Sequence, residues 1–349
     1  MPPEIGSEFH WDPAVLLDPE QGGLPRWLPA RRELFATGSG ALSSLLSALA
    51  PTGRLHVPSY FCMGVAEFLA RQLPVVFYRH LPEEGPRWET LRAADGDVVL
   101  AQNLFGREEG TAWHNWTRAH PRVTVIEDHS HDPFSDWART STAAYAIASL
   151  RKTLPLPDGG LLWSPSGHGL PRPFGTGPQR AAGLKLAAML LKAAWQDGRP
   201  IPKDRFRALQ QQGEQQILGS AAEASAVTAA LLPLLDVEGI RSSSSRNAQE
   251  VATALGDRVL GAGGFRVQLV LASESERDRI LAYLAKIGIF APVHWRQDRD
   301  GFWSGDEEAA ALAGRMLTLP VDHRCGPADL QRIVESIEGF ARMDLSGAI

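Results

Sequence analysis

The chain has 349 residues, of which 44% are hydrophobic and 21% charged, and a formal net charge of −5 at pH 7. This length predicts two subdomains rather than one small core, and the composition is typical of a soluble globular protein. The negative charge gives no general attraction to nucleic acid or anionic membranes, and two cysteines, Cys62 and Cys325, cannot form a disulfide framework. Without a signal-peptide pattern or an apolar run of about 20 residues, we expect a cytoplasmic protein with no membrane or nucleic-acid partner.

Short apolar runs alternate with helical or turn-rich segments between about residues 34 and 165. Ala41–Leu49 and Cys62–Gln72 are the clearest helices. Several of the expected strands are too uniformly apolar to have a solvated face, which predicts a mostly parallel sheet covered on both sides, with right-handed crossovers. The expected strands are Arg54–Val57, Val75–Tyr78, Asp97–Ala101, Val123–Ile126, Ala144–Ser149 and Gly160–Trp163.

Residues 165–180 are rich in Pro and Gly and indicate a loop or boundary. Beyond it, the composition predicts helices over Arg180–Trp195 and Ala221–Leu235, with a polar Gln-rich helix face between them and a further helix starting within Ser242–Ser245. A small α+β domain follows. We therefore expect a large domain over residues 1–235, with an N-terminal arm over about 1–33, and a small domain over 236–349. The small domain's expected elements are strands Arg266–Leu271, Ile289–Val293 and Leu317–Pro320 and helices Glu274–Lys286 and Ala328–Phe340.

The first lysine of the chain is Lys152, and only 5 of the 35 Lys and Arg residues are lysines. An ε-amine can lose its proton and form a Schiff base, whereas a guanidinium cannot. Lys152 follows an apolar strand and precedes a Pro/Gly-rich turn, where α/β enzymes present reactive groups. By itself the position also suits a surface lysine at a strand end.

Two other segments carry chemistry of their own. Gly38-Ser39-Gly40 leads directly into a helix, and such a turn presents backbone N–H groups to a phosphate, although Gly/Ser turns are common. Asp128 ends a strand and His131 follows three residues later, so the two side chains can contact one flat heteroaromatic ring. Alternatively the acid is a helix cap or one half of a surface pair. A metal site is another alternative, with Asp128, His129, His131 and Asp132 as ligands, but it lacks the spacing of a recognised motif.

A phosphate turn, an acid at a strand end and a Ser149-x-x-Lys152 segment at the next strand end form one set. Together they supply an anion anchor, a partner for a pyridine nitrogen and a Schiff-base amine, which are the parts needed to hold pyridoxal 5′-phosphate (PLP). The order and content resemble the DegT/StrS-type aminotransferases, which are fold-type I PLP enzymes. The matching segments are Gly38–Leu42, Val57–Tyr60, Glu127-Asp128 with His131, Lys152 with Gly159-Gly160, Gly288-Ile289, His294-Trp295 and Leu319-Pro320. Ile5–Phe9 and Ala148–Lys152 further resemble a poorly characterised subgroup of the family.

The resemblance implies a homodimeric aminotransferase with an α/β fold of type I. Lys152 would be the Schiff-base lysine and Asp128 the partner of the pyridine nitrogen. His131 would lie near the ring, and Gly38, Ser39, Gly40 and Ser149 would bind the phosphate. The donor implied is an amino acid, glutamate in most of the family, and the acceptor implied is a keto compound of the nucleotide-linked keto-sugar class.

Two departures from the family pattern affect this interpretation. The aromatic residue expected over the cofactor ring corresponds to Phe61 or Cys62, and the family's Asn-Tyr-Arg stretch, which reaches the partner's cofactor, has no counterpart around Gly219–Ser225. Asn103 is a further candidate for cofactor or substrate contact, or a turn-stabilising residue. His294 and Trp295 either line the substrate cleft or pack in the small domain. Arg151 either binds an anion or is a surface charge.

The sequence is compatible with two other functions. A PLP enzyme of another reaction type, such as elimination, decarboxylation, racemisation or C–C bond formation, uses the same cofactor parts. A non-catalytic PLP- or sugar-binding regulatory protein is the remaining alternative.

Overall fold

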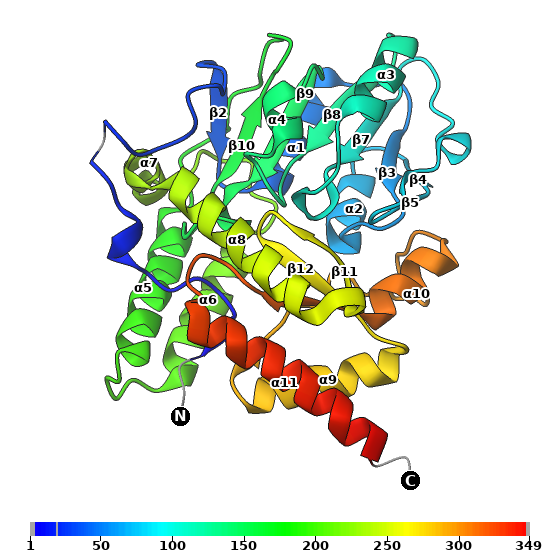
Figure 1. Ribbon diagram of the computed structural model, residues 1–349. Coiled ribbons are helices and arrows are strands. Elements are labelled where there is room, and N and C mark those ends of the chain that lie inside the picture. Colours follow the sequence, from blue (N-terminus) through cyan, green and yellow to red (C-terminus); the bar gives the residue numbers. More distant parts are fainter. Residues whose placement is uncertain (1–3, 19, 347–349) are drawn as a thin grey trace.

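The computed structural model describes residues 4–18 and 20–346, and its centre is a seven-stranded sheet (Figure 1). The strand order is β2-β10-β9-β8-β7-β3-β4; β9, β8, β7, β3 and β4 are parallel, whereas β10 is antiparallel to both neighbours. All six expected strands are present within one or two residues, and β2 adds a seventh. The strands are β2 (Arg32–Phe35), β3 (Leu55–Pro58), β4 (Val75–Tyr78), β7 (Val98–Gln102), β8 (Thr124–Asp128), β9 (Tyr145–Ser149) and β10 (Gly160–Trp163).

Both faces of this sheet are covered, as predicted. Leu100 and Ile126 point to the face packed by α1 (Gly38–Leu49) and α2 (Met63–Ala70). Their neighbours Val99 and Val125 point to the opposite face, where α3 (Thr111–Ala119) and α4 (Asp136–Thr140) contribute Trp113 and Trp137. Successive strand residues are therefore buried on opposite sides, which explains why these strands have no polar alternation. A two-stranded ribbon, β5 (His80–Leu81) with β6 (Gly85–Pro86), lies beyond β4.

The segment after β10 is irregular up to α5 (Gln179–Gln196), which packs beside α6 (Lys203–Ile217), as Figure 1 shows. Two helix starts differ from the predictions. The helix expected over Ala221–Leu235 is α7 (Ala226–Leu231), because Ser225 caps it and is itself held by Asp158 at 2.8 Å. The next helix, α8 (Val237–Leu255), begins before the serine run, because Asp236 accepts a hydrogen bond from Gly239 and provides the cap.

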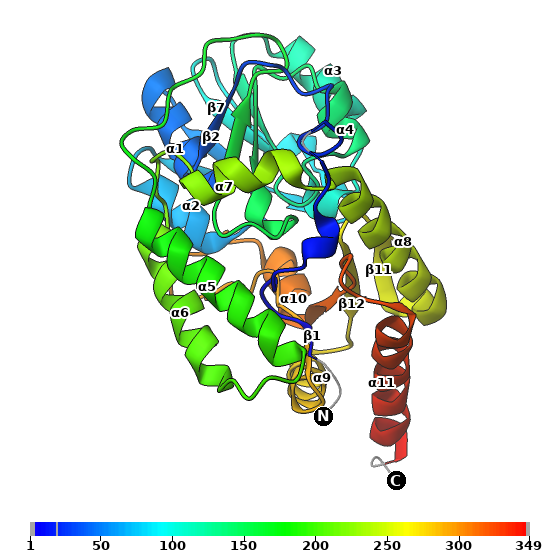
Figure 2. The ribbon, with the colours of Figure 1, turned by 90° about the vertical axis from the view of Figure 1, so that its left-hand side faces the viewer.

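The C-terminal part is a three-stranded antiparallel sheet with helices around it. Its strands are β11 (Val259–Gly263), β12 (Arg266–Val270) and β14 (Met316–Pro320), and its helices are α9 (Glu274–Lys286), α10 (Glu307–Arg315) and α11 (Pro327–Ser346). Its core includes residues from the second half of α8 and also Ile5, because β1 (Ile5–Gly6) pairs in parallel with β13 (Ile289–Phe290). Figure 2 shows the N-terminal segment passing between α5 and α8 to reach β1.

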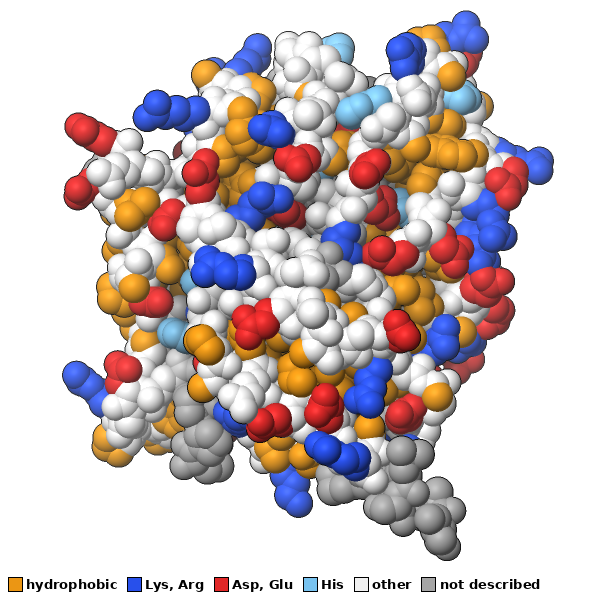
Figure 3. Space-filling view, in the orientation of Figure 1, with side chains coloured by type: hydrophobic (Ala, Val, Ile, Leu, Met, Phe, Trp, Pro, Cys, Tyr) orange, Lys and Arg blue, Asp and Glu red, His pale blue; other side chains and the backbone are white. Residues whose placement is uncertain are grey.

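The surface carries charges of both signs. Figure 3 shows Lys and Arg side chains interspersed with Asp and Glu on the face that it displays. Among the helices of the described residues, none has the length and apolar character needed to cross a membrane. Both cysteines are free.

Candidate active site

The carboxyl ends of the parallel strands bring the predicted site residues to one edge of the large sheet. Asp128 ends β8 and Ser149 ends the neighbouring β9, and a short 3-10 turn, Leu150–Lys152, carries Lys152 away from that edge. The start of α1 is in contact with the same place, since a Cβ atom on Gly38 would lie 3.1 Å from Cβ of Ser149. The structure therefore groups Gly38, Ser39, Asp128, Ser149 and Lys152.

The first turn of α1 has free hydrogen-bond donors. Thr37 caps the helix by accepting a hydrogen bond from the Gly40 N–H at 2.9 Å. Within the part of the chain that the structure describes, no hydrogen bond uses the backbone N–H of Gly38 or Ser39, or the hydroxyl of Ser149. A side chain at Gly40 would collide with the carbonyl of Ser220, so the turn requires glycine there. The positive end of α1 and these donors suit a phosphate group.

Asp128 is fixed in place by the loop that follows it. One carboxylate oxygen accepts the Ser130 N–H at 2.8 Å, and the Ser130 hydroxyl in turn accepts the Ser149 N–H at 2.9 Å. The ends of β8 and β9 are thus tied together. The other carboxylate oxygen of Asp128 has no partner among the described residues, so it remains available to a ligand.

His131 presents a buried donor without a partner. Its Nδ1 accepts the Phe105 N–H at 2.8 Å, which assigns the ring proton to Nε2. Burial lowers the pKa of His131 well below its usual value, and the positive charges of Arg266 and Lys152 lower it further, so the imidazole is neutral. Its buried Nε2 makes no hydrogen bond with the described residues, and its ring stacks on Phe105 and on Trp295, each 5.2 Å away between centroids. A neutral N–H of this kind can donate to a ligand oxygen.

Lys152 is exposed and lines a cavity of about 520 Å³. No hydrogen bond to Nζ is formed within the described ranges, and Nζ lies 5.9 Å from the centre of the Trp295 ring. The protein around the cavity lowers the pKa of Lys152 mainly by desolvation, whereas the nearby Asp128 and Cys62 raise it. A larger fraction of this amine is therefore neutral than in an ordinary exposed lysine.

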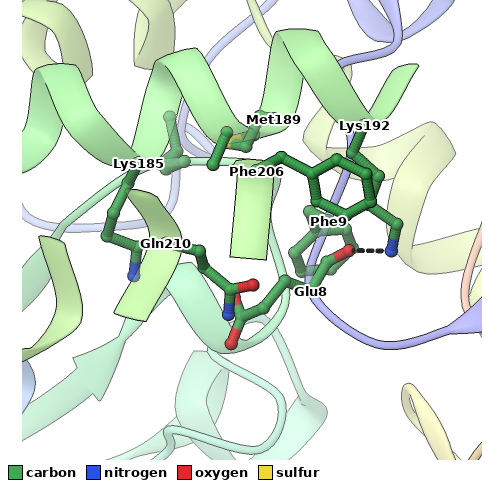
Figure 4. A pocket seen from close by; sticks show the side chains of 9 residues that line it. Glu8, Phe9, Lys185, Met189, Lys192, Phe206 and Gln210 are labelled. Carbon is green, nitrogen blue, oxygen red and sulfur yellow. Dashed lines mark hydrogen bonds between the residues drawn. The ribbon is translucent and has the colours of Figure 1, made fainter. Parts of the chain in front are cut away.

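The N-terminal arm forms part of the cavity wall. Gly6, Ser7, Glu8 and Phe9 line the cavity, and Glu8 and Phe9 also cover a pocket of about 20 Å³ on α5 and α6 (Figure 4). Lys192 holds the arm there by donating hydrogen bonds to the carbonyl oxygens of Glu8 at 2.6 Å and Gly6 at 3.1 Å. The sequence singled out Ile5–Phe9 by resemblance, but nothing in it placed these residues at the cavity wall.

Trp295 occupies a central position. The sequence left open whether this residue lines the substrate cleft or packs in the interior. Its ring lies 5.2 Å from His131, 5.9 Å from Tyr60 and 6.4 Å from Phe61. Phe61 is buried in the core under the sheet, and Cys62 is half-buried at the start of α2. The residues around Lys152 thus include an aromatic group from the C-terminal part of the chain.

Other candidates are engaged by the protein. Both ends of the Asn103 amide have partners, the Glu108 N–H and the Ser135 hydroxyl, each at 3.0 Å. Arg151 pairs with Glu214 on α6 at 2.8 Å. Of the four alternative metal ligands, His129 bonds Glu127 and Asp132 pairs with Arg241, and nowhere in the described residues do three His, Cys, Asp or Glu side chains form a metal-binding group.

No protein-family model matches this chain, and no curated protein matches its sequence. Solved structures are similar in fold. Spr1654 from Streptococcus pneumoniae, assigned as a sugar aminotransferase and solved in its PMP form, is 13% identical over 99% of both chains, with a TM-score of 0.67. A DegT DnrJ EryC1 StrS aminotransferase from Brucella abortus is 18% identical over 92% of both chains, with a TM-score of 0.59. Serine palmitoyltransferase from Sphingomonas wittichii is 13% identical over 92% of this chain and 74% of its own, with a TM-score of 0.58. These similarities confirm the predicted fold-type I architecture.

Proposed function

We propose that this protein is a PLP-dependent aminotransferase of the DegT/StrS type. It would move an amino group from an amino acid, with glutamate the expected donor, to a keto acceptor, with a nucleotide-linked keto sugar the expected class. The observation that supports this most directly is the grouping of Lys152, Asp128 and the Gly38-Ser39 turn at one sheet edge, each with a polar group that has no partner among the described residues. The fold neighbours that are sugar aminotransferases agree with it.

The unpartnered groups fit PLP in number and kind. Two free backbone N–H groups and the Ser149 hydroxyl suit its phosphate, and the free oxygen of Asp128 suits a protonated pyridine nitrogen. The buried Nε2–H of His131 suits the ring oxygen. PLP supplies an aldehyde that attaches an amine covalently and a ring that stabilises negative charge on the neighbouring carbon.

The chain's own groups would then perform three tasks. The Gly38-Ser39 turn and Ser149 bind the phosphate and orient the ring, and Asp128 holds a proton on the pyridine nitrogen. Lys152 Nζ would take a proton from the α-carbon of the amino donor and deliver it to C4′ of the cofactor, because its lowered pKa leaves more of it as the free base. The Trp295 ring, 5.9 Å from Nζ, gives that amine an aromatic neighbour on one side.

The cavity in front of Lys152 supports an acceptor larger than an amino acid. A volume of about 520 Å³ lies in the range that holds drug-sized ligands. Its walls come from the C-terminal sheet, the arm and the Lys152 turn, so a long substrate would contact all three.

A PLP enzyme of another reaction type remains the second candidate. The fold likeness to serine palmitoyltransferase favours it, and so does the missing Asn-Tyr-Arg stretch. The same lysine, acid and phosphate turn serve these reactions, because all of them begin by stabilising a carbanion.

A homodimer is part of the proposal, and a cytoplasmic location stays a prediction. Two of the most exposed apolar side chains are Phe174 at 89% and Leu218 at 74%. Their segments are joined by a hydrogen bond of 3.1 Å, which the Phe174 N–H donates to the Ala221 carbonyl. Ser220, next to Ala221, packs against the turn at Gly40. A second copy of the chain would cover apolar surface beside the phosphate turn, and light scattering would measure the mass in solution.

The deciding experiment has two stages. The protein is loaded with PLP and reduced with borohydride, and peptide mass spectrometry should find the cofactor on Lys152. Loaded, unreduced protein is then mixed with glutamate without an acceptor, and it should release one equivalent of 2-oxoglutarate per subunit. A cofactor on Lys152 without release of a keto acid from any donor amino acid would favour the second candidate, and a cofactor on another residue would refute both.

A further inference from the structure

The start of β12 lies at the junction between the large sheet and the C-terminal part. Phe265 is buried in the core cluster of the large sheet, together with Ala146 and Ala148 of β9. Val267, two residues later, is buried in the C-terminal core with Leu317 of β14. Arg266 therefore lies between two cores, and its side chain lines the cavity in front of Lys152.

The Arg266 guanidinium connects the two loops that carry the candidate chemistry. Nη1 donates to the carbonyl oxygen of His131 at 2.9 Å, and Nη2 donates to the carbonyl oxygen of Lys152 at 3.1 Å. Because the guanidinium is planar and rigid, its two nitrogens hold the two carbonyls at a fixed separation. The backbones of Lys152 and His131 are thereby set relative to each other and to β12.

Arg266 is buried, yet no carboxylate lies within ion-pair distance of it in the described part of the chain. Desolvation lowers its pKa to about 10, opposed only by the more distant Asp132 and Asp322. A buried cation without an ion pair costs folding free energy, and a neutral donor could bond the same carbonyls at a lower cost. Packing and hydrogen bonding alone therefore do not explain why a charged side chain occupies this position.

We propose that Arg266 is a positioning residue, which holds the backbones of Lys152 and His131 in place across the junction between the two cores. The inference rests on the proposed function of Lys152 as the reactive amine. The fixed charge of Arg266 has a second effect, because it lowers the pKa of Lys152. One side chain thus links the placement of this amine to its basicity.

The charge around Lys152 comes from several elements, so the contribution of Arg266 must be measured against the others. Asp128 and Cys62 raise the pKa of Lys152, and Arg151 lowers it together with Arg266. The ionisable or charged groups that face Lys152 are Asp128 at the end of β8, Cys62 before α2, Arg151 in the same turn, Arg266 on β12, and the neutral His131 and His294.

The test uses the full-length protein without cofactor and three variants. Arg266→Met removes the charge and both hydrogen bonds, and Arg266→Lys keeps the charge without the planar fork. Arg107→Met is the matched control: Arg107 also ties the β11–β12 hairpin to the large domain, by a 2.7 Å hydrogen bond to the Leu260 carbonyl, but it does not contact Lys152 or His131. Labelling of Lys152 by an amine-reactive ester is followed from pH 6 to 10 by peptide mass spectrometry, and hydrogen exchange is measured for residues 129–134 and 150–156.

We expect Arg266→Met to raise the apparent pKa of Lys152, and each unit of increase slows labelling about tenfold at a pH below that value. Arg266→Lys should leave the pKa near that of the wild type while hydrogen exchange in the two loops becomes faster. Arg107→Met should change neither quantity. Unchanged labelling and exchange in Arg266→Met, or equal changes in Arg107→Met, would overturn the proposal. If Arg266→Met does not fold, the proposal would be overturned by an Arg266→Lys variant whose two loops exchange hydrogen as slowly as in the wild type.

None of these measurements requires turnover or bound cofactor. A failure of the proposed aminotransferase activity and a failure of the Arg266 proposal are therefore separate results.

Discussion

Lys152 and Lys192 lie in different surroundings, because Lys152 is exposed at a cavity whereas Lys192 is buried. Lys192 is 2% exposed and has three partners, the carbonyls of Gly6 and Glu8 and the carboxylate of Glu4 at 3.4 Å. Lys152 faces a cavity, and in the described structure its amine has no hydrogen-bonding partner. Desolvation is the largest influence on both amines and lowers the pKa of Lys192 to about 8. A lowered pKa alone therefore does not distinguish the proposed reactive lysine from a structural one, whereas their hydrogen-bond partners differ.

The strongest test of this difference is Lys152→Ala. We expect the rate of amino transfer to fall about 10⁴-fold, because the variant loses the group that moves the proton as well as the covalent attachment point. The free energy of unfolding should change by less than about 0.5 kcal/mol, since the amine makes no bond that stabilises the fold. Single-turnover kinetics and urea unfolding check the two parts, with the exposed Lys286→Ala as the control. A large loss of stability would place Lys152 in the same class as Lys192.

Lys192→Met should show the opposite pattern. It leaves the carbonyls of Gly6 and Glu8 without their donor and takes one of two lysines from Glu4, which also pairs with Lys203. We expect a loss of about 3 kcal/mol in the free energy of unfolding, at the low end for breaking a buried pair, because Lys203 remains. Urea unfolding beside Lys286→Met measures it. A loss no greater than that of the control would mean that the arm is not held by this lysine.

The arm should also weaken in acid through His10. Burial lowers the pKa of His10 from 6.5 to about 4, with the positive charges of Arg324 and Lys192 adding to the effect. Between these values the unfolded chain takes up a proton that the folded protein does not, so stability falls as the pH falls from 6.5 towards 4. Between pH 7.5 and 5 we expect the wild type to lose about 1–2 kcal/mol more than His10→Asn. Urea unfolding at the two pH values checks this, and equal losses would contradict it.

The smallest effect is expected at the phosphate turn. Ser149→Ala removes one hydroxyl, which should weaken PLP binding about fivefold, corresponding to about 1 kcal/mol for a single hydrogen bond. Pyridoxal, which lacks the phosphate, should bind the variant and the wild type equally. Fluorescence titration with the two compounds separates the cases. An equal loss of affinity for both would show that Ser149 does not contact the phosphate.

The sequence by itself determined the elements of the large sheet and two of the chemical groups at its edge. Uniformly apolar runs predict strands buried on both faces, and the residue that follows such a run lies at the sheet edge, so Asp128 and Lys152 could be located without coordinates. Helix starts were less predictable. Ser225 and Asp236 begin α7 and α8 at positions that the composition alone did not distinguish from other polar residues.

Only the tertiary structure decided which distant residues complete the site. Arg266 bonds carbonyls 135 and 114 residues away, Trp295 stacks on His131, and Lys192 holds residues near the N-terminus. Periodicity and spacing carry information about neighbours within a strand or helix turn, whereas these contacts depend on how separate elements pack. Likewise, nothing in the sequence near Lys152 shows that it lines a cavity, because the other walls come from elements distant in the chain.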